Sequence, residues 1–127
     1  MTATPQNRSA LGEACVHALT AYDPPNAAQR RLRTAFLAHL TRRPDGWSRA
    51  CAGAHLTASA LVSSPAADQV LLVHHRKLRR WLQTGGHLEP TDSTPAAAAF
   101  REAREESGLH DLRQLPGIIH LDRHEVP

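Results

Sequence analysis

The sequence predicts one domain of the mixed α/β (α+β) class that begins with two helices. Hydrophobic residues recur at helical spacing over the first third of the chain, and the pattern then changes to alternation and short apolar runs. The length of 127 residues suffices for one domain with a modest core. Aromatic residues make up only 4% of the chain, so Leu, Val and Ala must supply most of this core.

Two helices are expected near the N-terminus. Ser9 can cap the first, over about residues 9–21, and an Asp-Pro-Pro-Asn stretch then separates it from a second helix over about residues 27–41. We therefore divide the chain into an N-terminal helical extension, residues 1–47, and a second part, residues 48–127. The extension is expected to contribute stability rather than chemistry.

One helix and several strands are expected in the second part. The helix covers residues 96–107, and Gly108 is a natural C-terminal terminator. The segments on either side of it alternate in polarity or form short apolar runs, as strands do. The expected strands fall within residues 54–62, 69–75, 81–89 and 116–126.

Composition excludes a membrane protein and disfavours a histidine metal site. No apolar run reaches the roughly 18 residues of a membrane span, and the N-terminus lacks the regions of a signal peptide. We expect a cytoplasmic protein, in which Cys15 and Cys51 are reduced and partly buried. His74 and His75 are adjacent, so in a strand they would point to opposite faces, which is poor geometry for one metal.

Positive charge is clustered, although the net charge is only +3. The cluster at residues 29–33 has the pattern of a solvated helix face, whereas the cluster at residues 74–80 leads directly into a diglycine and is a better candidate for contacting phosphate. Nucleic acid is not an expected partner, because no aromatic platform is interleaved with these cations. Trp47 and Trp81 are candidates for stacking on a base, but each is more typical of a core or an interface.

The helix at residues 96–107 carries an unusual concentration of acidic residues. Glu102, Glu105 and Glu106 are spaced i, i+3 and i+4, so they share one side, while Arg101 and Arg104 are expected to point elsewhere. Three adjacent carboxylates repel one another, and those near the helix C-terminus also oppose the helix dipole. A hard divalent cation would relieve both costs. A merely solvated acidic face is the alternative.

Residues Gly85 to Leu109, GGHLEPTDSTPAAAAFREAREESGL, resemble the Nudix box, whose pattern is G-x5-E-x7-R-E-U-x-E-E-x-G-U with U an aliphatic residue. Gly85, Gly86 and Glu89 resemble the opening GGxxE of the family. The order of strands, glycine loop and acidic helix is also similar from about residue 50 onward. The second half of the box matches at Arg101, Glu102, Ala103, Glu105, Glu106, Gly108 and Leu109.

The first half of the box is shifted by one residue. Counted back from the arginine, the box glutamate would fall at Ser93 and the box glycine at His87, whereas the chain offers Asp92 and Gly86. A one-residue insertion in the loop at residues 90–95 would account for both shifts. Asp92 would then stand in for the glutamate.

The resemblance implies a Nudix-like α/β/α sandwich around a mixed sheet, and a hydrolase that cleaves a diphosphate linkage in a nucleoside diphosphate derivative or a related metabolite. It implies Mg²⁺ or Mn²⁺ as the cofactor, held by Glu102, Glu105 and Glu106, with the Gly86 carbonyl as a further ligand and Arg101 orienting a carboxylate. A non-catalytic nucleotide- or metabolite-binding module of the same fold is the alternative. The residues expected near a phosphorylated substrate are Arg76, Lys77, Arg79, Arg80 and His87.

A Nudix core usually continues beyond this point with further strands and a helix. The last part of the core is therefore expected to be missing from these 127 residues, with weakened activity as the consequence. A last strand at residues 117–121 would have an uncovered edge, and such edges invite pairing with another chain. This predicts either a homodimer formed through that edge or incomplete folding near the end of the chain.

Overall fold

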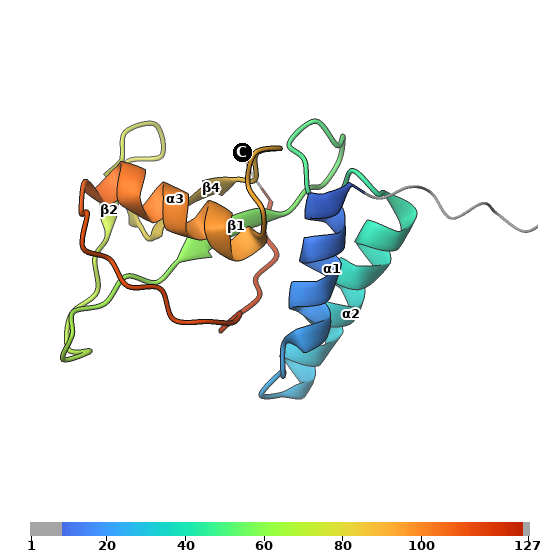
Figure 1. Ribbon diagram of the computed structural model, residues 1–127, viewed down its shortest axis with the longest axis horizontal. Coiled ribbons are helices and arrows are strands. Elements are labelled where there is room, and N and C mark those ends of the chain that lie inside the picture. The colour runs from blue at the N-terminus through green and yellow to red at the C-terminus, as the bar shows by residue number, and fades with distance from the viewer. Residues whose placement is uncertain (1–8, 126–127) are drawn as a thin grey trace, which may run out of the picture.

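The computed structural model describes residues 9–125, which contain three helices and four short strands (Figure 1). The mixed α/β class is confirmed, with two helices preceding the first strand. Each helix begins within one residue of its predicted start. The elements are α1 (Ala10–Ala21), α2 (Ala27–Arg42), β1 (Thr57–Ala60), β2 (Val73–His75), β3 (Arg80–Leu82), β4 (Thr84–His87) and α3 (Pro95–Ser107).

Side-chain caps start both N-terminal helices. The Ser9 hydroxyl accepts a hydrogen bond from the Gly12 amide at 3.1 Å, as the sequence predicts, and the Asn26 side chain does the same for the Gln29 amide at 2.9 Å. The two helices lie side by side (Figure 1). Cys15 is buried between apolar neighbours, and burial raises the pKa of its thiol to about 11, which keeps it protonated at neutral pH.

The strands form two small antiparallel pairs, β1 with β4 and β2 with β3. An isolated parallel bridge joins Ser48 to Leu88, so parallel pairing is limited to that one contact in the described part of the chain. The strands are shorter than their predicted segments: only residues 57–60 of 54–62 and 73–75 of 69–75 pair as strands, and the segment at 81–89 is divided between β3 and β4. Ala67, in the turn between the first two segments, adopts a left-handed conformation with φ of 56°.

One hydrophobic core joins the N-terminal helices to the rest of the protein. Small residues, Ala98, Ala99 and Ala103, form the buried side of α3 and allow it to lie close to β1 and β4. The division of the chain at residues 47 and 48 stays a prediction, but the helices before it share this core with the strands. The buried core residues include Leu11, Leu19, Leu40, Ala58, Leu88, Ala98 and Leu121.

The segment after α3 differs from the prediction. Residues 108–125 contain neither helix nor strand, so the strand expected within residues 116–126 is wrong for the described part; residue 126 lies outside the described residues. The segment instead returns to α2, where the Gln29 side chain accepts a hydrogen bond from the Leu121 amide at 2.8 Å and donates one to the Leu121 carbonyl at 2.9 Å. The homodimer expected through this strand edge therefore loses its structural basis.

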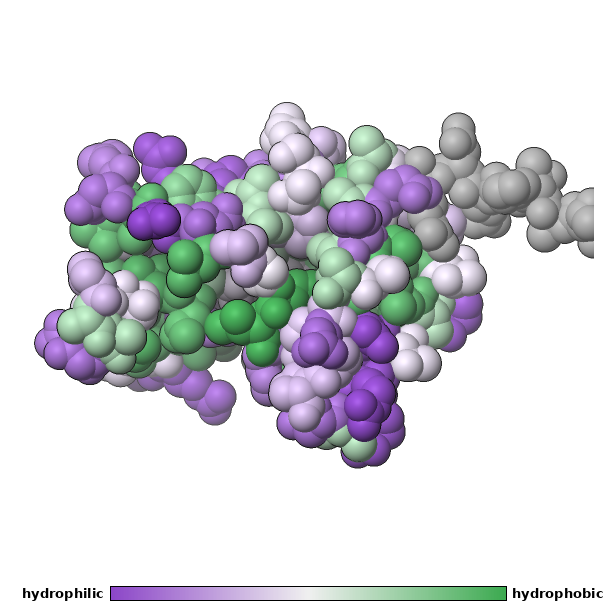
Figure 2. Space-filling model, turned by 60° about the horizontal axis from the view of Figure 1, so that its bottom comes forward, coloured by the Kyte–Doolittle hydropathy of each residue, from purple (hydrophilic) through white to green (hydrophobic). Residues whose placement is uncertain are grey.

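Hydrophobic side chains gather on the face shown in Figure 2, over the part of the molecule away from the two N-terminal helices. Several large apolar residues are exposed, among them Leu115 and Ile119 after α3 and Trp81 in β3. In the described part of the chain, no helix has both the length and the hydrophobicity that a membrane crossing requires.

Replacing Gln29 with Ala is expected to lower the free energy of unfolding by on the order of 3 kcal/mol. The substitution leaves both backbone groups of buried Leu121 and the Tyr22 hydroxyl, which is 2.8 Å from the Gln29 carbonyl oxygen, without their partner. Urea unfolding measures the change. Exposed Gln83, replaced with Ala, is the matched control and should unfold like the parent. Equal stability of the two variants would contradict the role given to Gln29.

Candidate metal and phosphate site

The acidic end of α3 lies beside the glycines of β4. Strand β4 pairs with β1, and α3 packs on both strands. Thr94 caps α3 by accepting a hydrogen bond from the Ala97 amide at 3.0 Å, and Pro95 follows at the first helical position, where its missing N–H costs nothing. At the other end Gly108 adopts the left-handed conformation with φ of 71°, as the sequence predicts. The loop and helix of the box are thereby fixed against the sheet.

Arg101 is the centre of the site. Its Nε and Nη2 atoms donate to the two carboxylate oxygens of Asp92 at 3.0 and 2.9 Å, and its Nη1 atom donates to Glu102 at 2.8 Å. Nη2 also reaches the His87 carbonyl at 3.1 Å. Planar two-point pairing of this kind is the strongest form of charge-assisted hydrogen bond between side chains. Arg101 therefore connects α3 to the loop that precedes it, through Asp92 and the His87 carbonyl.

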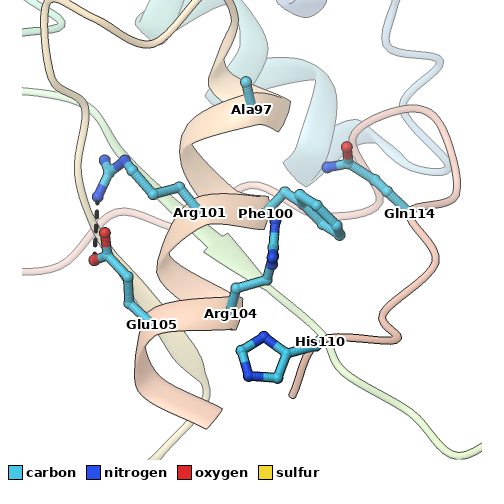
Figure 3. A pocket seen from close by; sticks show the side chains of 7 residues that line it. All are labelled: Ala97, Phe100, Arg101, Arg104, Glu105, His110 and Gln114. Carbon is cyan, nitrogen blue, oxygen red and sulfur yellow. Dashed lines mark ion pairs between the residues drawn. The ribbon is translucent and has the colours of Figure 1, made fainter. Parts of the chain in front are cut away.

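Two further carboxylates approach the same guanidinium. Its Nη1 atom is 3.5 Å from Glu105, the ion pair drawn in Figure 3, and 3.7 Å from Glu89. The expectation that Arg101 points away from the acidic face is therefore wrong. A helical projection places only the Cβ atom, whereas the long arginine side chain carries its charge back over Glu102 and Glu105. The guanidinium therefore offsets part of the repulsion among the glutamates, which was the reason for expecting a bound cation here.

Asp92 is the acid that pairs with Arg101, and Ser93 is not part of this pair. The side chain of Asp92 is only 6% exposed and also accepts a hydrogen bond from the Glu89 amide at 2.8 Å. The hydrogen bonds from Arg101 hold the pKa of Asp92 below its ordinary value, and Asp92 in turn raises the pKa of Arg101. This geometry agrees with an insertion between the loop and the helix, with Asp92 in place of the glutamate.

The diglycine brings backbone close to two of the carboxylates. The Gly85 amide donates to Glu106 at 2.9 Å. A Cβ atom on Gly86 would lie 2.8 Å from the Glu102 carboxyl carbon, so any larger residue would displace this carboxylate from its place beside the strand. Gly85 thus orients Glu106 through its amide, and Gly86 leaves space for Glu102.

The donor atoms of this site suit a hard divalent cation. Carboxylates and a backbone carbonyl are the ligands that Mg²⁺ and Mn²⁺ prefer. In the conformation described for residues 9–125, however, no three His, Cys, Asp or Glu side chains form a group that could hold a metal ion. Glu102 is turned to Arg101 and Glu106 to Gly85. Glu105 and Glu106 are exposed, so they can turn toward Glu102 without disturbing the core.

The predicted phosphate contacts lie on a separate element. Arg76, Lys77 and Arg79 occupy the turn between β2 and β3, and Arg80 begins β3. All four are exposed, and none forms an ion pair with the carboxylates in the described part of the chain. The structure therefore does not join this basic turn to the acidic site directly.

The two tryptophans have different surroundings. Trp47 is partly buried and packs against the core, as the more common interpretation of such a residue predicts. Trp81 is 66% exposed and meets the ring of His74 edge-on, with the ring centres 5.2 Å apart. These two residues face each other across the β2–β3 pair.

Sequence reasoning did not single out His55. The centre of its ring lies 5.1 Å from that of His87, the last residue of β4. His87 is the position at which the box glycine would fall when counted back from Arg101. Burial, followed by charge repulsion between the His55 and His87 rings, lowers the pKa of His55. The two rings come together because Thr57 pairs with His87 between β1 and β4. This pairing joins distant parts of the chain, so the spacing of residues along the sequence could not predict it.

Gly86→Ala is expected to weaken binding of a divalent cation such as Mn²⁺ by about tenfold to hundredfold while leaving the melting temperature nearly unchanged, because the flexible Glu102 side chain must move away from Arg101. Gly85→Ala is the matched comparison. There the Cβ atom would meet backbone of β1, 2.8 Å from the Ser59 Cα, so it should lower the free energy of unfolding by about 1–3 kcal/mol. Mn²⁺ titration and thermal unfolding separate the two variants. Equal effects of both variants on both measurements would show that Gly85 and Gly86 do not have these separate roles.

Comparison with known protein families identifies a domain that includes the elements of this site. The model of the NUDIX domain matches residues 53–126, more than half of the chain and all of the strands, the box loop and α3. No curated protein matches the sequence. With the family model covering the elements that build the site, the chain belongs to the Nudix family.

Proposed function

We propose that this protein is a metal-dependent hydrolase that cleaves a diphosphate linkage in a nucleoside diphosphate derivative or a related metabolite. Membership of the Nudix family supports a hydrolase-type function on a phosphorylated small molecule. The observation that carries the finer proposal is the close approach of Gly86 to the Glu102 carboxylate, beside the acidic end of α3. This close approach supports a site for oxygen donors at this edge of the sheet.

Glu102, Glu105 and Glu106 would hold Mg²⁺ or Mn²⁺, with the Gly86 carbonyl as a further oxygen donor. When bound, such a cation neutralises phosphate charge and lowers the pKa of a water molecule. Arg101 and Asp92 act on the protein side, because their paired hydrogen bonds fix the position of Glu102. Glu89 closes the same network from the box loop, through its ion pair with Arg101 and its hydrogen bond to Asp92.

Hydrolysis requires a group that accepts a proton from the attacking water. Glu105 and Glu106 are the exposed box carboxylates, so water has free access to them. Either can serve as general base if it comes within hydrogen-bond reach of the nucleophile. On the substrate side, His87 and the basic turn of Arg76, Lys77, Arg79 and Arg80 would contact phosphate oxygens.

One observation favours a second function, a non-catalytic module that binds a nucleotide or metabolite. Arg101 occupies the space between the acidic residues and already neutralises part of their charge. A binding module would keep this arrangement and need no cation. The two functions predict different dependence on divalent metal.

Release of phosphate or nucleoside monophosphate from a panel of nucleoside diphosphate derivatives tests the proposal. Each compound is incubated with the full chain in Mg²⁺, in Mn²⁺ and in excess chelator. We expect turnover of at least one compound with metal and none with chelator. Tight binding without turnover under all three conditions would replace the hydrolase by the binding module.

A further inference from the structure

An open pocket of about 540 Å³ lies on the outer side of α3, next to the acidic site (Figure 3). Its volume falls within the range of small-molecule sites, roughly 300–1,000 Å³. The segment after α3 forms the opposite wall, where the Gln114 side chain donates a hydrogen bond to the Ala96 carbonyl at 2.7 Å. We call it the outer pocket. Its lining residues are Ala97, Phe100, Arg101, Arg104, Glu105, His110 and Gln114.

Arg104 gives the outer pocket its charge. Its guanidinium lies 5.8 Å from the centre of the Phe100 ring, a cation–π arrangement that restricts the side chain before any ligand arrives. The one acid of the lining, Glu105, is paired with Arg101 at 3.5 Å. Among residues 9–125 no carboxylate lies within ion-pair distance of Arg104. Its positive charge is therefore available to a ligand.

We propose that the outer pocket binds the phosphate groups of a phosphorylated small molecule, with Arg104 as the principal contact. A guanidinium offers a planar pair of donors that matches two phosphate oxygens. His110 can supply a further ring N–H, and the amide oxygen of Gln114 can accept a hydrogen bond from a hydroxyl group. Phosphate held here would lie beside Arg101 and Glu105, which belong to both sites.

This inference rests on the proposed function, since it assigns part of the same substrate to a second set of residues. The shared chemistry is a diphosphate group, which a nucleoside diphosphate or inorganic pyrophosphate can provide. The two sources are distinguished by testing ADP, pyrophosphate and adenosine separately. Adenosine has no phosphate and should be insensitive to Arg104.

Calorimetric titration of the full chain with ADP and with pyrophosphate, in excess chelator, measures the phosphate contact without any role for metal. We expect Arg104→Ala to weaken binding of both by roughly tenfold to hundredfold, the range for a charge-assisted hydrogen bond. Weakening for ADP alone would assign the site to nucleotides. Arg104→Lys keeps the charge but loses the planar donor pair, so its affinity should fall between parent and Ala variant.

Arg113→Ala is the matched control, because this arginine is exposed on the same segment but does not line the outer pocket. Equal affinity of the Arg104 and Arg113 variants, or no measurable binding by the parent, would overturn the inference. Binding that depends on Arg104 in a protein without any hydrolase activity would support the outer pocket and refute the proposed function, so the two failures can be told apart.

Discussion

Glu105→Gln and Glu106→Gln are each expected to lower kcat/KM of metal-dependent hydrolysis by about 10³-fold, the scale of removing a charge-stabilising group. Both side chains are exposed, so the neutral amide should fit without disturbing α3. What changes is the charge: each substitution removes one of the oxygen anions that would hold Mg²⁺ or Mn²⁺. Steady-state kinetics on the best substrate measures the loss.

Glu13→Gln provides the control for charge alone, since Glu13 is also exposed but lies in the first turn of α1, away from the site. It should retain the parent kcat/KM. Activity of the two box variants close to that of Glu13→Gln would remove Glu105 and Glu106 from the chemistry.

Arg101→Ala is expected to have the largest effect on stability, lowering the free energy of unfolding by about 3–5 kcal/mol. The substitution leaves Asp92, with 6% of its side chain exposed, without its counter-charge. It also leaves Glu102 without its 2.8 Å partner, so the carboxylates repel one another. Urea unfolding at neutral pH measures the change, and activity should fall with it because Glu102 is no longer positioned.

The difference in unfolding free energy between the parent and Arg101→Ala should also depend on pH. The pKa of Asp92 is lowered in the folded protein, so its pairing stabilises the protein above the ordinary aspartate pKa of about 3.9 and is lost as the pH falls through the lower folded value. The gap in stability between the parent and Arg101→Ala should therefore narrow below about pH 4. Arg31→Ala on the exposed side of α2 should match the parent throughout. A gap that does not depend on pH would exclude the Asp92 pair as its source.

The features that the sequence predicted correctly are governed by neighbouring residues. Ser9 and Gly108 define helix ends through contacts within one turn, so a local pattern suffices for both. Residues 101–107 of the box lie on one continuous helix, and the membership of the chain in the Nudix family is confirmed. The mixed α/β class follows from the change of hydrophobic period, which the structure retains.

The features that were missed depend on contacts between distant segments. The apolar stretch at residues 117–121 favours a strand locally, but Leu121 bonds to the Gln29 side chain, 92 residues earlier in the chain. The reach of Arg101 and the contact of His55 with His87 also depend on the folded arrangement. Periodicity reports which side of an element a Cβ atom occupies, and it does not report where a long side chain ends.

Mn²⁺ binding, followed by electron paramagnetic resonance of the free ion, shows whether the acidic end of α3 holds a divalent cation. We expect the full chain to bind Mn²⁺, and Glu105→Gln and Glu106→Gln to bind it much more weakly with unchanged helix content by circular dichroism. Identical Mn²⁺ titrations of the parent and both variants, or no binding by the parent, would show that Glu105 and Glu106 do not hold a divalent cation.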